Sequence, residues 1–110
     1  MNKTDRIMMD LGHPERLHGT EYLRRAVMIY RPGMSMTKEL YPAIAEAVGS
    51  TATRVERNMR HSIETAWNRG NMTAQLRIFG YTVDPQKGRP TVGEYVAAVA
   101  KMVHEAGSGE

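Results

Sequence analysis

One segment, residues 49–70, constrains the fold of this chain more than any other. It repeats apolar residues at the 3.6-residue period of an α-helix, while polar and basic residues take the opposite side. The apolar side holds Val55, Met59, Ile63, Ala66 and Trp67. The other side holds Arg54, Arg57, Asn58, His61 and Thr65. The pattern predicts one long helix with one side in a core and the other in solvent.

A second amphipathic segment, SMTKELYPAIAEAVG, ends immediately before the long helix at Gly49. Its apolar residues recur at helical spacing as Leu40, Ile44 and Val48. Glycine accepts the left-handed conformation that ends many helices, and Thr51 is the expected N-cap of the next one. A helix, a glycine-containing turn and a cationic helix are the sequence form of a helix-turn-helix, here over about residues 37–69. We interpret the second helix as a recognition helix for DNA.

Two details of this pair leave alternatives open. Pro42 lies inside the first helix, and we prefer a helix bent at the proline because the apolar spacing continues without a slip. The alternative is a regular helix that begins only near Tyr41. Thr53 opens a capping-box pattern and is an alternative start for the second helix, but the short connection suits Thr51 better.

Two helices are predicted before this pair, over residues 5–11 and 20–30. Gly12 ends the first of them. Thr20 is the expected N-cap of the second. Both helices look like scaffold for the pair that follows.

Two helices are predicted after the pair. The first covers residues 71–79, with Leu76 and Phe79 turned inward. The second opens with a capping box formed by Thr91 and Glu94. Its apolar stripe is broad and consists of Val92, Tyr95, Val96, Val99, Met102 and Val103.

Residues 81–90 read as a loop from their proline and glycine content, and residues 106–110 as a disordered tail. No stretch alternates with the period of a strand, and no internal repeat is present. The expected fold class is all-α, with about six helices in a single domain over residues 1–110.

At 110 residues and 12.4 kDa the chain has the size of one domain. Its net charge is only +3, from 15 Lys and Arg against 12 Asp and Glu, so the overall charge is a weak argument for nucleic acid. The distribution says more, because residues 54–69 hold four arginines and one histidine against two glutamates. A basic face on an otherwise balanced protein is typical of a DNA-binding surface, and a merely solvated helix face is the alternative.

Other classes of protein find little support. The chain has no cysteine, which excludes disulfides, thiolate metal ligands and a cysteine nucleophile. No apolar run approaches the roughly 20 residues of a membrane span and no signal-peptide pattern opens the chain, so we expect a cytoplasmic protein without membrane contact. The dispersed histidines predict no metal, and we expect no other cofactor. No nucleophile, base and orienting group come together, so we expect no enzyme.

Several short motifs of the chain are familiar as a set. They are Thr37-Lys38, Leu40-Tyr41-Pro42, Arg54-Val55-Glu56-Arg57, Arg60-His61, Ala66-Trp67, Arg69-Gly70-Asn71, Phe79-Gly80-Tyr81-Thr82-Val83 and Pro90-Thr91. Together they resemble the C-terminal effector domain of the sporulation response regulator, stage zero sporulation protein A, over roughly residues 6–104. The resemblance implies a six-helix domain that binds short promoter boxes of TGTCGAA type. The family's N-terminal receiver domain is not in this sequence, which leaves open an excised effector domain or a short stand-alone relative.

The long helix matches the DNA-reading part of that family. The resemblance implies base contacts from Arg54, Glu56 and Arg57, in the first turns, where a recognition helix enters the major groove. The planar fork of arginine suits O6 and N7 of guanine, and glutamate accepts from N4 of cytosine. Asn58 stands where the family tends to have a small or aliphatic residue, and we add it as a base-contacting candidate. For Glu56 the alternative is an i,i+4 ion pair with Arg60, which the helical period favours.

Phosphate contacts are expected from residues around the turn and further along the helix, namely Lys38, Thr51, Thr53, Arg60 and His61. Lys38 would act with the N-terminus of its own helix, whose free amides favour an anion. Such contacts set register and salt dependence rather than sequence preference. Trp67 lies on the apolar side, so we assign it to the core rather than to base stacking.

The resemblance also implies a protein partner. The segment that looks like the family's contact with the housekeeping sigma subunit of RNA polymerase contains Asn71, Met72, Ala74, Gln75 and Arg77. An alternative function is therefore a protein-interaction module that binds sigma factor or a full-length regulator without specific DNA binding. A homodimer on tandem boxes, formed through the last helix, extends the first hypothesis. Binding to double-stranded DNA would place the protein at the bacterial nucleoid.

Overall fold

All regular structure in the described part of the chain is helical. The computed structural model describes residues 2–69, 71–80 and 88–108. Its α-helices are α1 (Lys3–Asp10), α2 (His18–Ile29), α3 (Tyr41–Val48), α4 (Ala52–Asn68), α5 (Met72–Phe79) and α6 (Val92–Ser108). A π-helical turn, η1 (Met36–Leu40), leads directly into α3. The predicted all-α fold with about six helices in one domain is confirmed.

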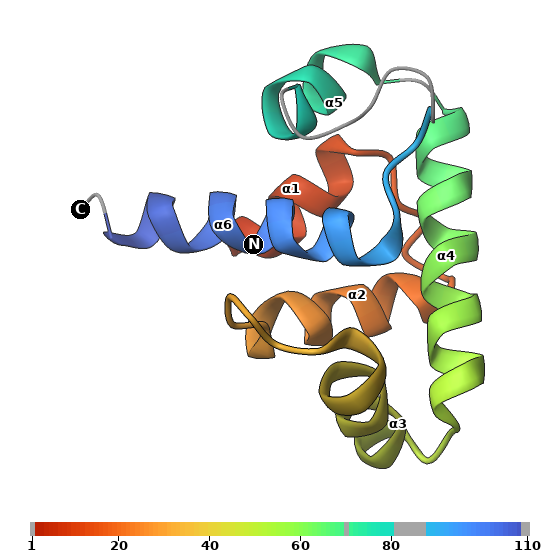
Figure 1. Ribbon diagram of the computed structural model, residues 1–110. Helices are drawn as coiled ribbons and strands as arrows, with labels where there is room; N and C mark the ends of the chain where they lie inside the picture. The colour runs from red at the N-terminus through yellow and green to blue at the C-terminus, as the bar shows by residue number, and fades with distance from the viewer. Residues whose placement is uncertain (1, 70, 81–87, 109–110) are drawn as a thin grey trace.

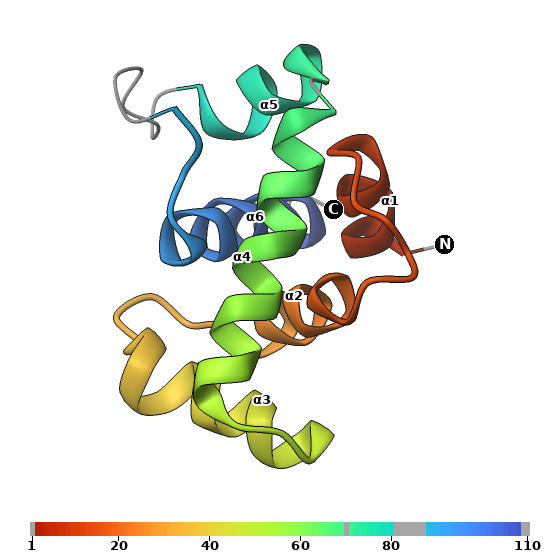
Figure 2. The ribbon, with the colours of Figure 1, turned by 90° about the vertical axis from the view of Figure 1, so that its right-hand side faces the viewer.

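Helix α4 stands along one side of the molecule, with α3 at one end and α5 at the other (Figure 1). Helices α2 and α6 lie against each other and run away from α4 at a steep angle, and α1 packs against both of them, behind α6 in the view of Figure 1 (Figures 1 and 2). Helix α4 packs most extensively on α2 and then on α3. One side of α4 is therefore left without a helix over it, as Figure 2 shows.

The apolar side of α4 faces the core as predicted. Val55, Met59, Ile63 and Ala66 are each at most 1% exposed. Their buried neighbours from α2 and α6 include Leu23, Ala26, Val27, Tyr95, Val96 and Val99. Trp67 is half-buried against the same core, and its ring meets that of Phe79 edge-on with centroids 5.7 Å apart. A burial pattern with this period orients the opposite side of α4 toward solvent.

The connection between α3 and α4 is the tight turn that the sequence predicts. Gly49 ends α3 with φ at +69°, a left-handed conformation that side chains with a Cβ disfavour. The Thr51 hydroxyl accepts the N–H of Arg54 at 3.2 Å, so Thr51 is the N-cap of α4 and the Thr53 alternative is wrong.

The expectation of a regular helix bent at Pro42 is wrong. The regular α-helix begins at Tyr41, which was the alternative, and Pro42 lies in its first turn. The π-helical turn η1, Met36–Leu40, directly precedes Tyr41. Pro42 has no N–H with which to continue the hydrogen bonds of that turn, and the regular α-helix begins at the residue before it.

Helix α2 begins two residues earlier than expected, at His18. Its N-cap position is Leu17, which has no side chain able to accept a hydrogen bond, so the Thr20 cap is wrong. The Thr20 hydroxyl instead donates to the carbonyl of Pro14 at 2.6 Å, and the residue is 1% exposed.

Helix α5 is rotated relative to the prediction. Phe79 is buried as expected, but Leu76 is 66% exposed, and Ala74 and Ile78 are buried instead. The Asn71 side chain caps α5 by accepting the N–H of Ala74, and helical spacing from Ala74 then brings Ile78 inward.

The last helix has the capping box that the sequence predicts, and it is longer than expected. The Thr91 hydroxyl accepts the N–H of Glu94, and the Glu94 carboxylate accepts the N–H of Thr91. Helix α6 continues to Ser108, so residues 106–108 belong to it rather than to a disordered tail. Residues 109–110 and most of the loop expected over residues 81–90 lie outside the described residues.

Candidate nucleic-acid interface

The start of α4 presents a row of exposed side chains at the turn after α3. Thr51, Thr53, Arg54 and Arg57 are all exposed, whereas Val55 between them is fully buried. The cap on Thr51 fixes where the helix begins, and therefore which residues occupy its first turns. Both arginines thus lie on the solvent side of the N-terminal half of α4, the half that enters the major groove in helix-turn-helix proteins.

Glu56 is held at the flank of this row. Its carboxylate Oε1 lies 3.6 Å from Nε of Arg60, the i,i+4 pair that the helical period favours. Burial and, second, the Glu56 carboxylate raise the pKa of Tyr41, so the carboxylate also borders α3. Glu56 thus lies between Arg60 of α4 and Tyr41 of α3. A carboxylate restrained in this way is oriented but still about one third exposed.

Asn58 is half-buried at the opposite margin, where α4 meets α2. Its side-chain Nδ2 donates to the carbonyl of Arg54 at 2.8 Å, one turn back in the same helix. Its own backbone carbonyl lies against Gly19 of α2. Asn58 thus has less freedom to reach a base than the two arginines, because one amide proton is already used within the helix.

The middle of α4 continues the cationic face. Arg60 and His61 are exposed, and the hydroxyl of Thr65 donates to the carbonyl of His61 at 3.0 Å. Lys38 is exposed on η1, but the N–H of Lys38 is bonded to the Ser35 hydroxyl at 3.1 Å. The expected free amides at that helix start are therefore partly occupied by the protein itself.

Arg89 is a cation of this face that the sequence reading missed. It lies in the segment before α6, and its guanidinium is 3.5 Å from the Glu64 carboxylate of α4. An open depression is lined by Arg57, Asn58, Arg60, His61, Glu64 and Arg89. No local pattern marks Arg89, since it is one charged residue in a stretch rich in proline and glycine. Only the packing of the α6 start against α4 brings it to the face.

Most of the residues expected to contact a sigma subunit are buried or already have a hydrogen-bond or ion-pair partner within the protein. Ala74 is buried, and Asn71 serves as the α5 cap and also donates to the carbonyl of Asp10. Gln75 donates to the carbonyl of Trp67, and Arg77 lies 3.3 Å from the Asp10 carboxylate. The remaining member, Met72, is 67% exposed, and Leu76 one turn later is 66% exposed. The outward surface of α5 thus places two exposed apolar side chains, Met72 and Leu76, beside the exposed polar residues Thr73 and Arg77.

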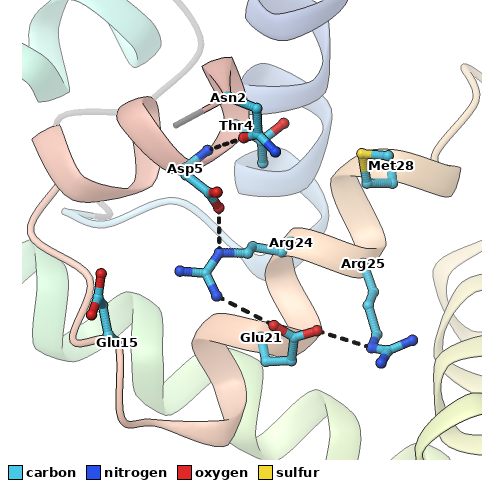
Figure 3. Close-up of a pocket in the computed structure, with 8 residues that line it drawn as sticks. All are labelled: Asn2, Thr4, Asp5, Glu15, Glu21, Arg24, Arg25 and Met28. Atoms are coloured by element: carbon cyan, nitrogen blue, oxygen red, sulfur yellow. Dashed lines mark hydrogen bonds and ion pairs between the residues drawn. The ribbon is translucent and has the colours of Figure 1, made fainter.

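A second depression, between α1 and α2, carries charges that are already paired. Nε of Arg24 lies 2.6 Å from the Asp5 carboxylate, and Glu21 bridges Arg24 and Arg25 at 3.2 Å each (Figure 3). These i,i+3 and i,i+4 pairs give Arg24 and Arg25 a structural explanation. Most of the cations of α2 thus face carboxylates, in contrast to Arg54 and Arg57 of α4, for which no carboxylate lies in ion-pair range in the described residues.

The described residues contain neither a cluster of metal-ligating side chains nor a membrane-spanning helix. Within them no three His, Asp or Glu side chains gather in a way that could hold a metal ion. None of their helices has the length and apolar character needed to cross a membrane.

The family model described as "Sporulation initiation factor Spo0A C terminal" matches residues 4–103, nearly the whole chain. This family is a DNA-binding regulatory domain rather than a catalytic one. The match agrees with a six-helix fold that leaves one basic side of the second helix of a helix-turn-helix uncovered. The chain belongs to the Spo0A C-terminal family of DNA-binding effector domains of sporulation regulators.

Proposed function

We propose that this chain regulates transcription by binding a short promoter box of TGTCGAA type in duplex DNA through the major-groove face of α4. The observation that carries the proposal is the exposed pair Arg54 and Arg57 in the first turns of α4, after a turn fixed by Gly49 and Thr51. Both guanidinium groups lack an ion-pair partner in the described residues, so they need not break one to reach a base edge. Bidentate arginine contacts to guanine are the commonest base-specific contacts in major grooves.

Glu56 fits a role as acceptor for a cytosine amino group. The Arg60 pair restrains its carboxylate, so less side-chain entropy is lost when it binds. Asn58 is a secondary base-contacting candidate that would have to exchange its bond to the Arg54 carbonyl for one to a base.

The residues that we propose as phosphate contacts lie around the exposed row that holds Arg54 and Arg57. Thr51 and Thr53 lie at its N-terminal end, Arg60 and His61 lie along the middle of α4, and Lys38 lies on η1 before α3. Arg89 from the segment before α6 adds a cation beside them. Contacts of this kind set the position of the helix on the duplex and make binding salt-dependent.

The test is a fluorescence-anisotropy titration of the protein with a labelled duplex that holds the TGTCGAA box, against a scrambled duplex of equal length and composition. We expect tighter binding to the box at physiological salt. Equal affinity for the two duplexes would contradict specific recognition. Selection of bound sequences from random DNA would then identify the preferred box and the influence of Asn58.

A second function is favoured by the exposed apolar pair on α5. Met72 and Leu76 are one turn apart and two thirds exposed, as expected for a surface that a protein covers. We propose the sigma subunit of RNA polymerase as the partner of this surface. Met72→Ser with Leu76→Ser should abolish co-purification with the sigma subunit and leave box binding unchanged. Co-purification without any specific DNA binding would instead favour the pure protein-interaction module.

A homodimer on tandem boxes is an extension of the main proposal. The last turns of α6 are furthest from α4 (Figure 1), and Met102 and Val103 there are only half-buried. Sedimentation of the free protein and of its complex with one and two boxes tests this. A monomer under all three conditions would exclude the dimer.

A further inference from the structure

Four polar residues of the core form one continuous hydrogen-bonded chain. They are Tyr95 of α6, His13 before α2, Ser62 of α4 and Thr20 of α2. The Tyr95 hydroxyl is 2.6 Å from Nε2 of His13, and Nδ1 of His13 is 2.8 Å from Oγ of Ser62. The Ser62 and Thr20 hydroxyl oxygens are 2.9 Å apart. All four residues are buried, with Ser62 and Tyr95 at most 1% exposed.

The direction of every hydrogen bond among these four residues follows from the bond that Thr20 makes to Pro14. Thr20 donates its single hydroxyl proton to the carbonyl of Pro14 at 2.6 Å, so toward Ser62 it acts as the acceptor. Ser62 therefore donates its hydroxyl proton to Thr20 and accepts a hydrogen bond from Nδ1–H of His13. His13 is then the Nδ1–H tautomer, and its bare Nε2 accepts from the Tyr95 hydroxyl.

These directional hydrogen bonds fix the position of α4 on α2 more narrowly than apolar packing does. Apolar contact is non-directional, and at Gly19 the helix α2 meets the backbone of Asn58 without a side chain of its own. If α4 slid or rotated on α2, Ser62 would lose both partners and leave buried polar atoms unpaired. Only one position of the middle of α4 satisfies every member of the chain.

We propose that the chain Tyr95–His13–Ser62–Thr20 is a positioning device for the DNA-reading helix: it fixes the depth and register at which α4 lies on α2 and α6, and thereby the discrimination between DNA sequences. Ser62 directly follows His61 and lies just over one turn beyond Arg57, so a shift at Ser62 moves both residues relative to the duplex. The inference rests on the proposed function, since it concerns the same face. None of its four members belongs to the exposed row itself.

Two substitutions open the chain at its ends while nearly preserving side-chain volume. Tyr95→Phe removes the donor to His13, and Thr20→Val removes the acceptor for Ser62. Thr20→Ser is the matched control, because it keeps the hydroxyl. For each folded variant we would measure affinity for the TGTCGAA duplex and the scrambled duplex. We expect the ratio of the two affinities to fall about fivefold to tenfold in Tyr95→Phe and Thr20→Val, mainly through the specific complex, and to remain near wild type in Thr20→Ser.

A second measurement needs no DNA. Long-range proton–nitrogen NMR spectra of the wild-type imidazoles should show His13 as the Nδ1–H tautomer, and amide shifts along residues 57–65 should move in Tyr95→Phe and Thr20→Val only. An unchanged affinity ratio in both variants would overturn the inference, as would an Nε2–H tautomer of His13. A wild-type protein that binds both duplexes equally would contradict the proposed function instead, while the tautomer and the shifts of α4 would still report on the chain.

Discussion

Gly19 and Asn58 lie so close that no other residue fits at position 19. A Cβ built on Gly19 would lie 1.9 Å from the carbonyl oxygen of Asn58 and 2.9 Å from Cβ of Ser62. Both distances are far below van der Waals contact, and the first obstacle is backbone that cannot rotate away. Helix α2 therefore approaches the backbone of α4 through a glycine, which explains a glycine in the first turn of a helix.

The first prediction follows from this contact. Glycine to alanine within a helix ordinarily stabilises by about 0.5–1 kcal/mol, but Gly19→Ala should reverse that sign and destabilise by about 1–3 kcal/mol, as overpacking does. Urea unfolding followed by circular dichroism measures the change. Gly93→Ala is the matched control, since its Cβ would meet only Met36 at 3.5 Å. An unfolding midpoint of Gly19→Ala at or above that of the wild type would contradict the prediction.

A second prediction concerns the cap of α4. Thr51→Ala should destabilise the protein by about 0.5–2 kcal/mol, because it leaves the N–H of Arg54 without its partner. Thr53→Ala is the control at the position that a capping-box reading of the sequence favours, and it should change stability by less than about 0.5 kcal/mol. Chemical unfolding of the two variants decides between the positions. A larger loss in Thr53→Ala would reverse the assignment.

The parts of the fold that depend on local pattern follow well from the sequence. The buried row of α4, the left-handed Gly49 and the Thr51 cap are local consequences of periodicity and backbone chemistry. The prediction that Leu76 faces inward is wrong because the short α5 has two plausible apolar faces, and only its packing decides between them. Periodicity alone cannot choose in eight residues.

Contacts between residues that are distant in the sequence could not be predicted from it. Thr20 looks like a cap in the sequence, but its hydroxyl belongs to a network with a residue of α4. The hydrogen-bond partners of His13 are 49 and 82 residues away in the sequence. Arg89 meets Glu64 only because α6 begins beside α4. Side chains of this kind have no periodic signal, so only the assembled fold reveals them.

A third prediction concerns pH. Burial first, and then the positive charges of Arg24 and Arg69, lower the pKa of His13 from 6.5 to about 4. The folded protein thus keeps His13 neutral at a pH where the unfolded chain protonates it, so the unfolded state binds more protons between these two values. The contribution of His13 to the free energy of unfolding should therefore be complete above about pH 6.5. It should decline as the pH falls toward 4, by on the order of 3 kcal/mol.

The contribution of His13 can be separated from that of other groups. Asp5 and Glu15 line a small cavity beside His13, and their protonation at low pH would also change stability. His13→Leu removes one titration and leaves those carboxylates in place. The difference in unfolding free energy between wild type and His13→Leu, measured by urea titration from pH 7.5 to 4.5, should shrink as the pH falls. A difference that stays constant over that range would contradict a depressed pKa.

A fourth prediction separates base contact from phosphate contact. Arg57→Ala should weaken binding to the TGTCGAA duplex by about 1–3 kcal/mol and have little effect on the scrambled duplex. Lys38→Ala should weaken both alike. Lys101→Ala is the control, because Lys101 lies on α6 in an i,i+4 arrangement with Glu105, away from this face. Anisotropy titrations of the variants on both duplexes provide the comparison. An equal loss on both duplexes for Arg57→Ala would make it a phosphate contact.

The last prediction concerns Arg89, which the fold alone brings to α4. A cation that neutralises one phosphate contributes about 0.9 to the slope of log affinity against log salt concentration, so Arg89→Ala should lower that slope by about this amount on any duplex. Its partner Glu64 repels phosphate and holds the guanidinium at 3.5 Å. Glu64→Gln should therefore act in the opposite direction and raise affinity for both the box and the scrambled duplex.

The two variants together distinguish a DNA contact from a purely structural ion pair. If the pair only joined the start of α6 to α4, both substitutions would change stability alike and leave the salt slope untouched. Opposite effects on affinity, with similar unfolding midpoints, arise only if Arg89 faces the duplex, because the removal of a cation and the removal of an anion then change the local potential with opposite signs. Titrations at several salt concentrations between 50 and 300 mM, on the order of the range where counterion release dominates, measure both slopes.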